Sequence, residues 1–460
     1  MDRQWEKRMP MLCAVLGVVM LAISSAVCMR LELGGWLDRA GVAVMLILFA
    51  AISLALLRLE GVRRDALLVM LLPIGAAMLI RALCLDYASG DYKGFLSHWY
   101  EYFKINGGFS TIAGSVGNYN VPYLYFIAFI SYFDVPDLYL YKLFSILWDV
   151  ALAWGCLRLT RSLTRERQGS GAPLIAFGAA LFLPTVALNG ALWAQCDVIY
   201  GALAIHAASL LLEGRNKTSV ALMAVAFSFK LQAVFVLPLW GVLWLAKKVK
   251  FRELWVFPPV YFLTIAPALL MGKPLKDILA IYLDQASSVS YLVLNAPTVY
   301  QFLPRDLQRG LAEGEINGLG PASMLGILAA ALLVLALLAL GWRLRDRLNR
   351  GTAMAVAVLL CIGVPFFLPH MHERYFFLAD VFTLCWACAD RRHIPLAVLA
   401  EGASLASYIV YFRQKYNFVL TLGSMQFGMP LETLVMLTAL VLAVRALLRE
   451  VRKSGRGLAI

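Results

Sequence analysis

The chain has 460 residues, of which 61% are hydrophobic and 15% charged, and its formal net charge is +13. Soluble domains are about half apolar and a quarter charged, so this composition excludes an ordinary soluble enzyme. The basic residues gather at the ends of alternate apolar runs and form no basic patch interleaved with aromatic residues. This placement indicates membrane topology and argues against nucleic acid as a partner.

Long apolar runs follow one another along the whole chain and predict membrane-spanning helices. About 20 apolar residues in an α-helix cross about 30 Å of hydrocarbon. Helices satisfy their own backbone polar groups, as lipid requires. We therefore predict an all-α integral membrane protein, a single multi-pass domain over residues 1–460 with about fourteen spans. The predicted spans are 10–29, 40–57, 66–85, 140–160, 174–190, 197–212, 218–230, 232–247, 254–271, 321–341, 353–368, 375–389, 394–411 and 429–448.

The orientation follows from the positive-inside rule. With both termini in the cytoplasm, most of the 41 basic residues fall on the cytoplasmic side. This agreement requires that the apolar stretch 121–133 does not cross the membrane, because a crossing would invert every later loop. The stretch is short and begins Val121-Pro122-Tyr123. We assign it to an outer loop of a plasma membrane protein, as a re-entrant or interfacial helix.

Two long segments then lie outside, at 86–139 and 272–320. A helix in the first segment would carry its aromatic side chains on one face, a pattern typical of a helix that lies in the membrane interface. These aromatic residues are Phe95, Trp99, Tyr102 and Phe103.

Ionisable residues at the ends of membrane spans are costly, and they often mark function. The outer candidates are Asp86, Asp91, Asp197, Lys230 and the run His370-Met-His372-Glu373-Arg374. Each has a structural alternative. Asp91 could cap a helix, Lys230 could reach the interface along its own stem, and the His370 run could be a polar turn. Zinc is disfavoured, because two histidines two residues apart do not share one helical face.

Taken together, the candidates suit an anionic, lipid-linked substrate. Cations hold a phosphate, and the candidates for this role are Lys230, Arg374, His370 and His372. A carboxylate accepts the proton of an attacking hydroxyl, while the bilayer holds the lipid tail.

Six stretches, in this order, resemble the GT-C superfamily of membrane glycosyltransferases. They are most similar to bacterial mannosyltransferase-like relatives of the enzyme that adds the second mannose of GPI anchors. The stretches are Ser89-Gly-Asp-Tyr-Lys-Gly-Phe-Leu, Asn118-Tyr-Asn-Val-Pro-Tyr-Leu-Tyr, Trp193-Ala-Gln-Cys-Asp-Val-Ile-Tyr, Phe227-Ser-Phe-Lys-Leu-Gln-Ala, Leu294-Asn-Ala-Pro and Pro369-His-Met-His-Glu-Arg-Tyr-Phe.

The resemblance implies a hexosyltransferase that uses a polyprenyl-phosphate sugar, with mannose suggested by the nearest relatives. It implies inverting transfer on the outer face, with Asp91 at the position of the family's catalytic aspartate. Such donors need no metal, and the chain has no Asp-x-Asp sequence, so no cofactor is expected. The acceptor stays open between a glycan, a lipid and a protein. The expected substrate-binding residues are Asp86, His98, Trp99, Trp193, Gln195, Asp197, Gln232 and Glu373.

A lipid-sugar flippase or transporter is the alternative, because it also needs many spans and buried charges. Transporters typically contain paired broken helices related by internal symmetry, and the sequence contains no evident repeat. Convergence of Asp91, Lys230 and Arg374 on one outward-facing cavity favours an enzyme. A site at the middle of the membrane favours transport.

Overall fold

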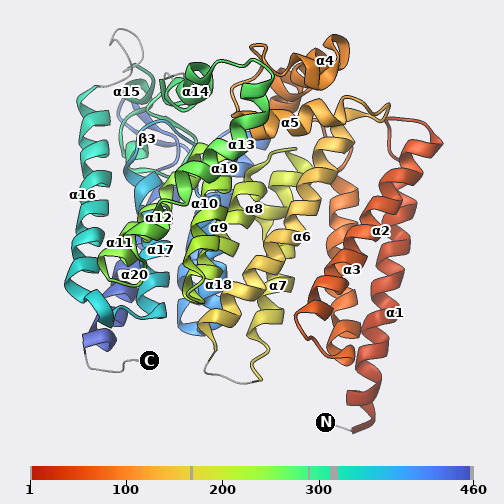
Figure 1. Ribbon diagram of the computed structural model, residues 1–460, viewed down its shortest axis with the longest axis horizontal. Coiled ribbons are helices and arrows are strands. Elements are labelled where there is room, and N and C mark those ends of the chain that lie inside the picture. The colour runs from red at the N-terminus through yellow and green to blue at the C-terminus, as the bar shows by residue number, and fades with distance from the viewer. Residues whose placement is uncertain (1–2, 166–168, 288–290, 311–319, 456–460) are drawn as a thin grey trace.

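The computed structural model describes residues 3–165, 169–287, 291–310 and 320–455, and this part of the chain is almost wholly helical (Figure 1). Nine of the described helical segments are long and apolar enough to cross a membrane. They contain α1 (Arg3–Cys28), α2 (Trp36–Leu59), α3 (Arg64–Cys84), α6 (Asp137–Leu163), α12 (Phe251–Leu254) with α13 (Phe257–Leu270), α16 (Pro321–Leu344), α17 (Arg350–Phe367), η8 (Arg391–His393) with α19 (Ile394–Arg413), and α20 (Pro430–Gly455).

The remaining predicted spans are helical but shorter or broken. One is a pair bent by 47°, which raises the number of candidate spans in the described residues to ten. The all-α membrane architecture is confirmed, whereas the count of fourteen spans stays a prediction. The shorter or broken spans are α7 (Ala172–Phe182) with α8 (Pro184–Ala187) and η3 (Leu188–Leu192), α9 (Asp197–Leu212), α10 (Asn216–Phe229), η4 (Leu231–Phe235) with α11 (Pro238–Leu245), and α18 (Phe377–Ala389).

Short elements gather at one end of the bundle, opposite the end at which both chain termini lie (Figure 1). The stretch predicted not to cross forms α5, whose ten residues span only about 15 Å. The short elements are η1 (Tyr92–Leu96), α4 (Ser97–Asn106), η2 (Gly108–Thr111), α5 (Val121–Ile130), α14 (Leu275–Ser287), β1 (Val293–Leu294), η5 (Val299–Phe302), α15 (Arg305–Gly310), β2 (Met371–His372), β3 (Leu420–Leu422) and β4 (Met425–Phe427). A further 3₁₀ turn, η7 (Arg345–Arg347), follows α16.

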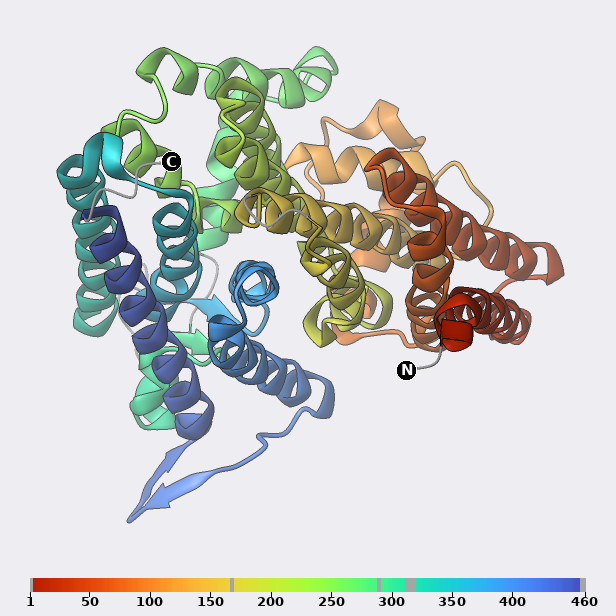
Figure 2. The same cartoon turned by 90° about the horizontal axis from the view of Figure 1, so that it is seen from below.

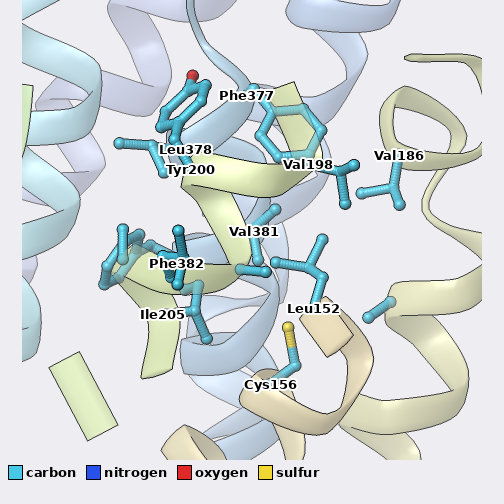
Figure 3. Packing of buried hydrophobic residues seen from close by; sticks show 14 of the residues in the cluster. Leu152, Cys156, Val186, Val198, Tyr200, Ile205, Phe377, Leu378, Val381 and Phe382 are labelled. Atoms are coloured by element: carbon cyan, nitrogen blue, oxygen red, sulfur yellow. The ribbon is translucent and has the colours of Figure 1, made fainter. Parts of the chain in front are cut away.

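The core lies where α6, α8, α9 and α18 meet, and it is packed with aliphatic and aromatic side chains (Figure 3). Phe377 packs directly over Gly201, where an added Cβ would lie 2.6 Å from its ring. Fifteen of the sixteen residues of α9 are buried. An interior helix of this kind is covered by protein on all sides, so its length need not match the hydrocarbon thickness.

Two buried cations fix the chain that leads to Asp91. Arg81 pairs with Asp149 at 2.8 Å, with both side chains fully buried. The ammonium of Lys142 donates to the carbonyl oxygens of Cys84, Leu85 and Tyr87 at 2.7–2.9 Å. Cys84 is the last residue of α3, and carbonyls at a helix end lack the amide partners of the helix interior, so Lys142 caps this end of the helix. The segment that follows therefore leaves α3 in a fixed direction.

We expect the two ends of the bundle to face opposite sides of the membrane. α5 lies at one end of the bundle and α7 begins at the other (Figure 1). Ser115 precedes α5 in the chain, Ser170 precedes α7, and both are exposed. All eight cysteines are buried or half-buried, so a cysteine introduced at either serine will dominate labelling by a membrane-impermeant maleimide. In intact cells Ser115→Cys should label and Ser170→Cys should not. Labelling of Ser170→Cys from outside, or of both variants alike, would contradict this topology.

Candidate active site

Asp91 stands at the first turn of the π-helical segment η1, and its side chain makes no capping hydrogen bond. Ser89 takes that role, since its hydroxyl accepts from the amide of Tyr92 at 3.1 Å and donates to the carbonyl of Trp193 at 2.8 Å. The capping alternative for Asp91 is therefore wrong. Its carboxylate is free to point away from its own helix.

Four donors converge on the Asp91 carboxylate. Oδ2 accepts from the indole of Trp193 at 3.0 Å, the amide of Gln195 at 2.7 Å and the guanidinium of Arg374 at 3.2 Å. Oδ1 accepts from the hydroxyl of Tyr411 at 2.9 Å. Donors from three distant parts of the chain thus orient one carboxylate, which still keeps 23% of its side chain exposed.

Asp197, at the start of α9, is a second and fully buried carboxylate. It forms an ion pair with the ammonium of Lys230 and another with Nε of Arg374 at 3.3 Å. Asn189 donates to its Oδ2 at 2.8 Å. Lys230 is 3% exposed, so it does not reach out to the interface, and that alternative is wrong. Arg374 bridges the two carboxylates, and the four charged groups balance.

A short parallel pairing brings the His370 run to the cavity. Strand β1 pairs with β2, so that Leu294 lies opposite His372. The side chain of Asn295 then donates to Glu373 at 3.0 Å. The two resembling stretches at 294–297 and 369–376 meet here, although some 75 residues separate them in the chain. The simple polar-turn alternative is wrong for this run.

These side chains surround one cavity of about 350 Å³. Several lining residues belong to η1, α4, β1 and β2. These short elements lie at the end of the bundle away from the termini (Figure 1). Asp91, Lys230 and Arg374 all line it, as the enzyme interpretation requires. Its lining in the described residues is Asp91, Phe95, Leu96, Trp99, Asn118, Tyr119, Gln195, Lys230, Gln232, Gln285, Leu294, His372, Glu373, Arg374, Tyr375 and Tyr411.

Burial sets the charge of two groups in the cavity wall. It raises the pKa of Glu373 to about 7, against the hydrogen bond from Asn295 and the charge of Arg374. It also lowers the pKa of His372, and the nearby Arg374 guanidinium adds to that effect. Burial and the Arg374 charge therefore both favour the neutral form of His372. A bound anion would favour its charged form.

Several expected substrate ligands do not reach the cavity. Trp193 is fully buried and stacks on Tyr411 at 3.9 Å, so it cannot stack on a sugar. It positions Asp91 instead. Asp197 is equally buried and serves Lys230 and Arg374. His98 is exposed and lies outside the described cavity lining.

Asp86 and His370 also lie outside that lining. Asp86 accepts from the hydroxyl of Tyr139 at 2.6 Å and from the amide of Glu32 at 3.1 Å. These hydrogen bonds connect the segment after α3 to α6 and to the loop between α1 and α2. Nδ1 of His370 lies 2.7 Å from the carbonyl oxygen of Tyr291. Of the two histidines, His372 alone lines the described cavity.

The structure adds residues that the sequence did not single out. Tyr411 bonds to Asp91 across 320 residues of chain, and no local pattern marks it. Tyr119 lies under the ammonium of Lys230, 5.3 Å from ring centre to Nζ. Asn118 and Tyr119 stand within one of the resembling stretches, which is the signal that could have identified them.

Glu373 gives a pH prediction for stability. Its pKa rises from about 4.5 unfolded to about 7 folded, so the folded chain binds the extra proton between these values. Stability must then fall as pH rises from about 4.5 to 7 and level off above. Glu373→Gln should remove up to about 3 kcal/mol of this dependence, seen as a flatter profile of thermal unfolding temperature against pH. The exposed Glu101→Gln is the control, and identical profiles for wild type and Glu373→Gln would contradict the assignment.

Comparison with known proteins identifies a family. The model of glycosyltransferase family 87 matches residues 118–369, which is more than half of the chain. The match includes Asp197 and Lys230, while Asp91 and Arg374 lie beyond its two ends. No curated protein matches the chain. The chain belongs to glycosyltransferase family 87, which identifies it as a membrane glycosyltransferase.

Proposed function

We propose that this enzyme transfers a hexose from a polyprenyl-phosphate sugar to an acceptor hydroxyl, with Asp91 as the general base. The observation that carries the proposal is the position of Asp91. Four donors orient its carboxylate, which nevertheless lines the cavity. The side chains of Lys230 and Arg374 line the same cavity. A carboxylate that is both fixed and accessible suits proton transfer.

In the proposed step the acceptor oxygen attacks the anomeric carbon while the bond from that carbon to the phosphate oxygen breaks. The bonding electrons leave with the phosphate, and the hydroxyl proton passes to Asp91. An alcohol becomes acidic only as its new bond forms, so proton transfer comes late. Attack opposite to the departing phosphate inverts the anomeric configuration.

Lys230 and Arg374 are the proposed phosphate ligands. An ammonium has three donors and a guanidinium has five, whereas their recorded ion pairs with Asp91 and Asp197 use only some of these. The donor is a diester with one negative charge, and the departing polyprenyl phosphate carries more. Fixed cations favour this growing charge, which is often the largest single contribution to catalysis.

The side of the cavity next to Lys230 also has the chemistry of a sugar site. Trp99 and Tyr119 pack edge to face at 5.5 Å, and the amides of Gln195 and Gln232 are close to the same space. Aromatic faces and amides are what sugar rings and hydroxyls contact. We assign the hexose to this side. Mannose follows only from the resemblance to mannosyltransferase-like relatives.

Several features support an outer-face site in the plasma membrane. The cavity is at the end away from the termini, and the arginine-rich turns favour cytoplasmic termini. A polyprenyl tail would then lie in the outer leaflet next to the cavity.

Transfer and transport differ in what they need. A flippase requires two compartments, whereas a transferase works in detergent micelles. Purified protein in detergent should convert a labelled polyprenyl-phosphate sugar and acceptor lipid extract to product. In sealed vesicles it should not speed movement of that donor between leaflets. Acceleration of movement without any product would favour the flippase.

We expect activity to survive a chelator. The proposed donor has a single phosphate and needs no metal to bridge a diphosphate, and Arg374 already bridges Asp91, which lines the cavity, and Asp197 behind it. Activity in excess EDTA should stay within about twofold of the untreated enzyme. Loss of activity that a divalent ion restores would make Asp91 and Asp197 metal ligands and remove Asp91 as the base.

A further inference from the structure

Two adjoining cavities lie at the opposite end of the bundle, where the termini are. Each has a volume of about 250 Å³, and they share Arg392, Glu450 and Lys453 in their linings. Figure 2 views the molecule from this end, where α17, α19 and α20 lie close together. The double cavity is formed by the start of α17, the turn η8 and the last turns of α20, so it is separate from the glycosyl-transfer site.

The lining is strongly cationic. Six cations face two carboxylates, of which Asp390 pairs with Arg392 at 2.6 Å and Glu450 pairs with Lys453. The other four arginines make no ion pair in the part of the chain that the structure describes. They are Arg165, Arg350, Arg449 and Arg452.

The walls are held in place before any ligand arrives. Ser454 near the end of α20 accepts from the amide of Asn349 at 2.9 Å, and its hydroxyl lies 3.1 Å from that of Thr352. The ring of His393 stacks on Trp386 at 3.8 Å. Contacts between α17 and α20 and between α18 and η8 thus fix the backbone positions from which the arginines extend.

Two further features suit an anion. Asn349, Arg350 and Gly351 line the cavity at the first turn of the 18-residue helix α17. Backbone N–H groups at such a turn favour negative charge. His393 lines the adjoining cavity, is 8% exposed, and its Nδ1 has no hydrogen-bond partner in the described residues. A buried polar atom without a partner is costly, and a ligand oxygen would satisfy it.

We propose that this double cavity binds a phosphate-bearing anion, either the headgroup of an anionic phospholipid or free phosphate. Membrane topology alone would account for arginines at this end. It does not account for two adjoining cavities, one lined by a helix N-terminus and the other by a buried imidazole, that share Arg392 and Lys453. Basic cavities between transmembrane helices on the cytoplasmic side are typical sites for phospholipid headgroups.

The test compares two charge-matched double variants. Arg449→Gln/Arg452→Gln removes two lining cations, and Arg63→Gln/Arg64→Gln removes two exposed arginines of the α2–α3 turn, outside both cavities. Delipidated protein is titrated with phosphatidylglycerol or phosphatidylcholine by native mass spectrometry, and with inorganic phosphate by thermal unfolding. Unfolding temperatures without ligand show whether each variant is folded. If the Arg449→Gln/Arg452→Gln variant is not folded, Arg350→Gln is used in its place.

Each arginine near a lipid surface changes affinity about fivefold, so the cavity variant should bind phosphatidylglycerol about 25-fold more weakly than wild type. The control variant should bind like wild type, and phosphatidylcholine should bind weakly to all. Phosphate binding that only the cavity variant loses identifies the free anion as the ligand. Equal loss in both variants, or no binding of either probe by wild type, would overturn the proposal.

Discussion

Asp91→Asn should lower the turnover number by roughly 10²–10⁴, the usual contribution of a general base, while donor binding stays within a few fold. The amide keeps the size of the side chain and can still accept hydrogen bonds from Trp193 and Gln195, but it cannot take the proton. Donor affinity should persist because Lys230 and Asp197 are untouched. Turnover is measured at saturating donor, and binding by equilibrium titration of the inactive variant.

Asp86→Asn is the matched control, five residues earlier in the same loop. Its carboxylate accepts from Tyr139 and from the amide of Glu32, so an asparagine keeps the shape and loses only a structural hydrogen bond or two. We expect a small loss of thermal stability and turnover within about threefold of wild type. Equal loss in both variants would leave Asp91 without a special role, and loss only in Asp86→Asn would transfer the base to Asp86.

Arg374→Gln should have the second largest effect, roughly 10²–10³ in turnover, as expected for removal of one group that stabilises developing charge. The guanidinium contacts both Asp91 and Asp197, so its loss also leaves two neighbouring carboxylates with less compensation. Arg374→Lys keeps the positive charge, but its ammonium can contact only one of the two carboxylates. Its turnover should therefore lie between that of Arg374→Gln and that of wild type. Rates are measured with thermal unfolding of each variant.

Arg305→Gln controls for the loss of an outer arginine. Arg305 stacks on Tyr416 at 4.6 Å and lies outside the described cavity lining, so this variant should turn over like wild type. A folded Arg374→Gln within threefold of wild type would contradict the assignment of Arg374 to the donor phosphate.

The sequence predicted the helical membrane architecture and about half of the residues that line the cavity, because both have local signals. Apolar runs predict helices along the whole chain. Asp91, Lys230 and Arg374 stand out as isolated charged residues near the ends of such runs. The number of spans is less accessible. Pro184 begins α8 after a bend, and Lys230 separates α10 from η4. Such breaks are tolerated where protein satisfies the freed backbone groups, and a hydropathy pattern does not record burial by protein.

The roles of individual side chains were less predictable, because they depend on contacts between distant segments. Trp193 looked like a sugar platform, yet it is buried under Tyr411 and donates to Asp91. Asp197 looked like a substrate ligand, yet it is the counter-ion of Lys230. Residue type and membrane side were enough to gather these groups at one site. They were not enough to separate those that face the cavity from those that support it.

The most direct test of the account is product formation from defined donors. Purified enzyme is incubated with a panel of polyprenyl-phosphate hexoses and an acceptor lipid extract, and polyprenyl phosphate and glycosylated acceptor are both counted by mass spectrometry. We predict equimolar formation of the two products from at least one donor, with Asp91→Asn forming neither above background. Release of no polyprenyl phosphate from any donor, or equal release by Asp91→Asn, would contradict the proposed mechanism.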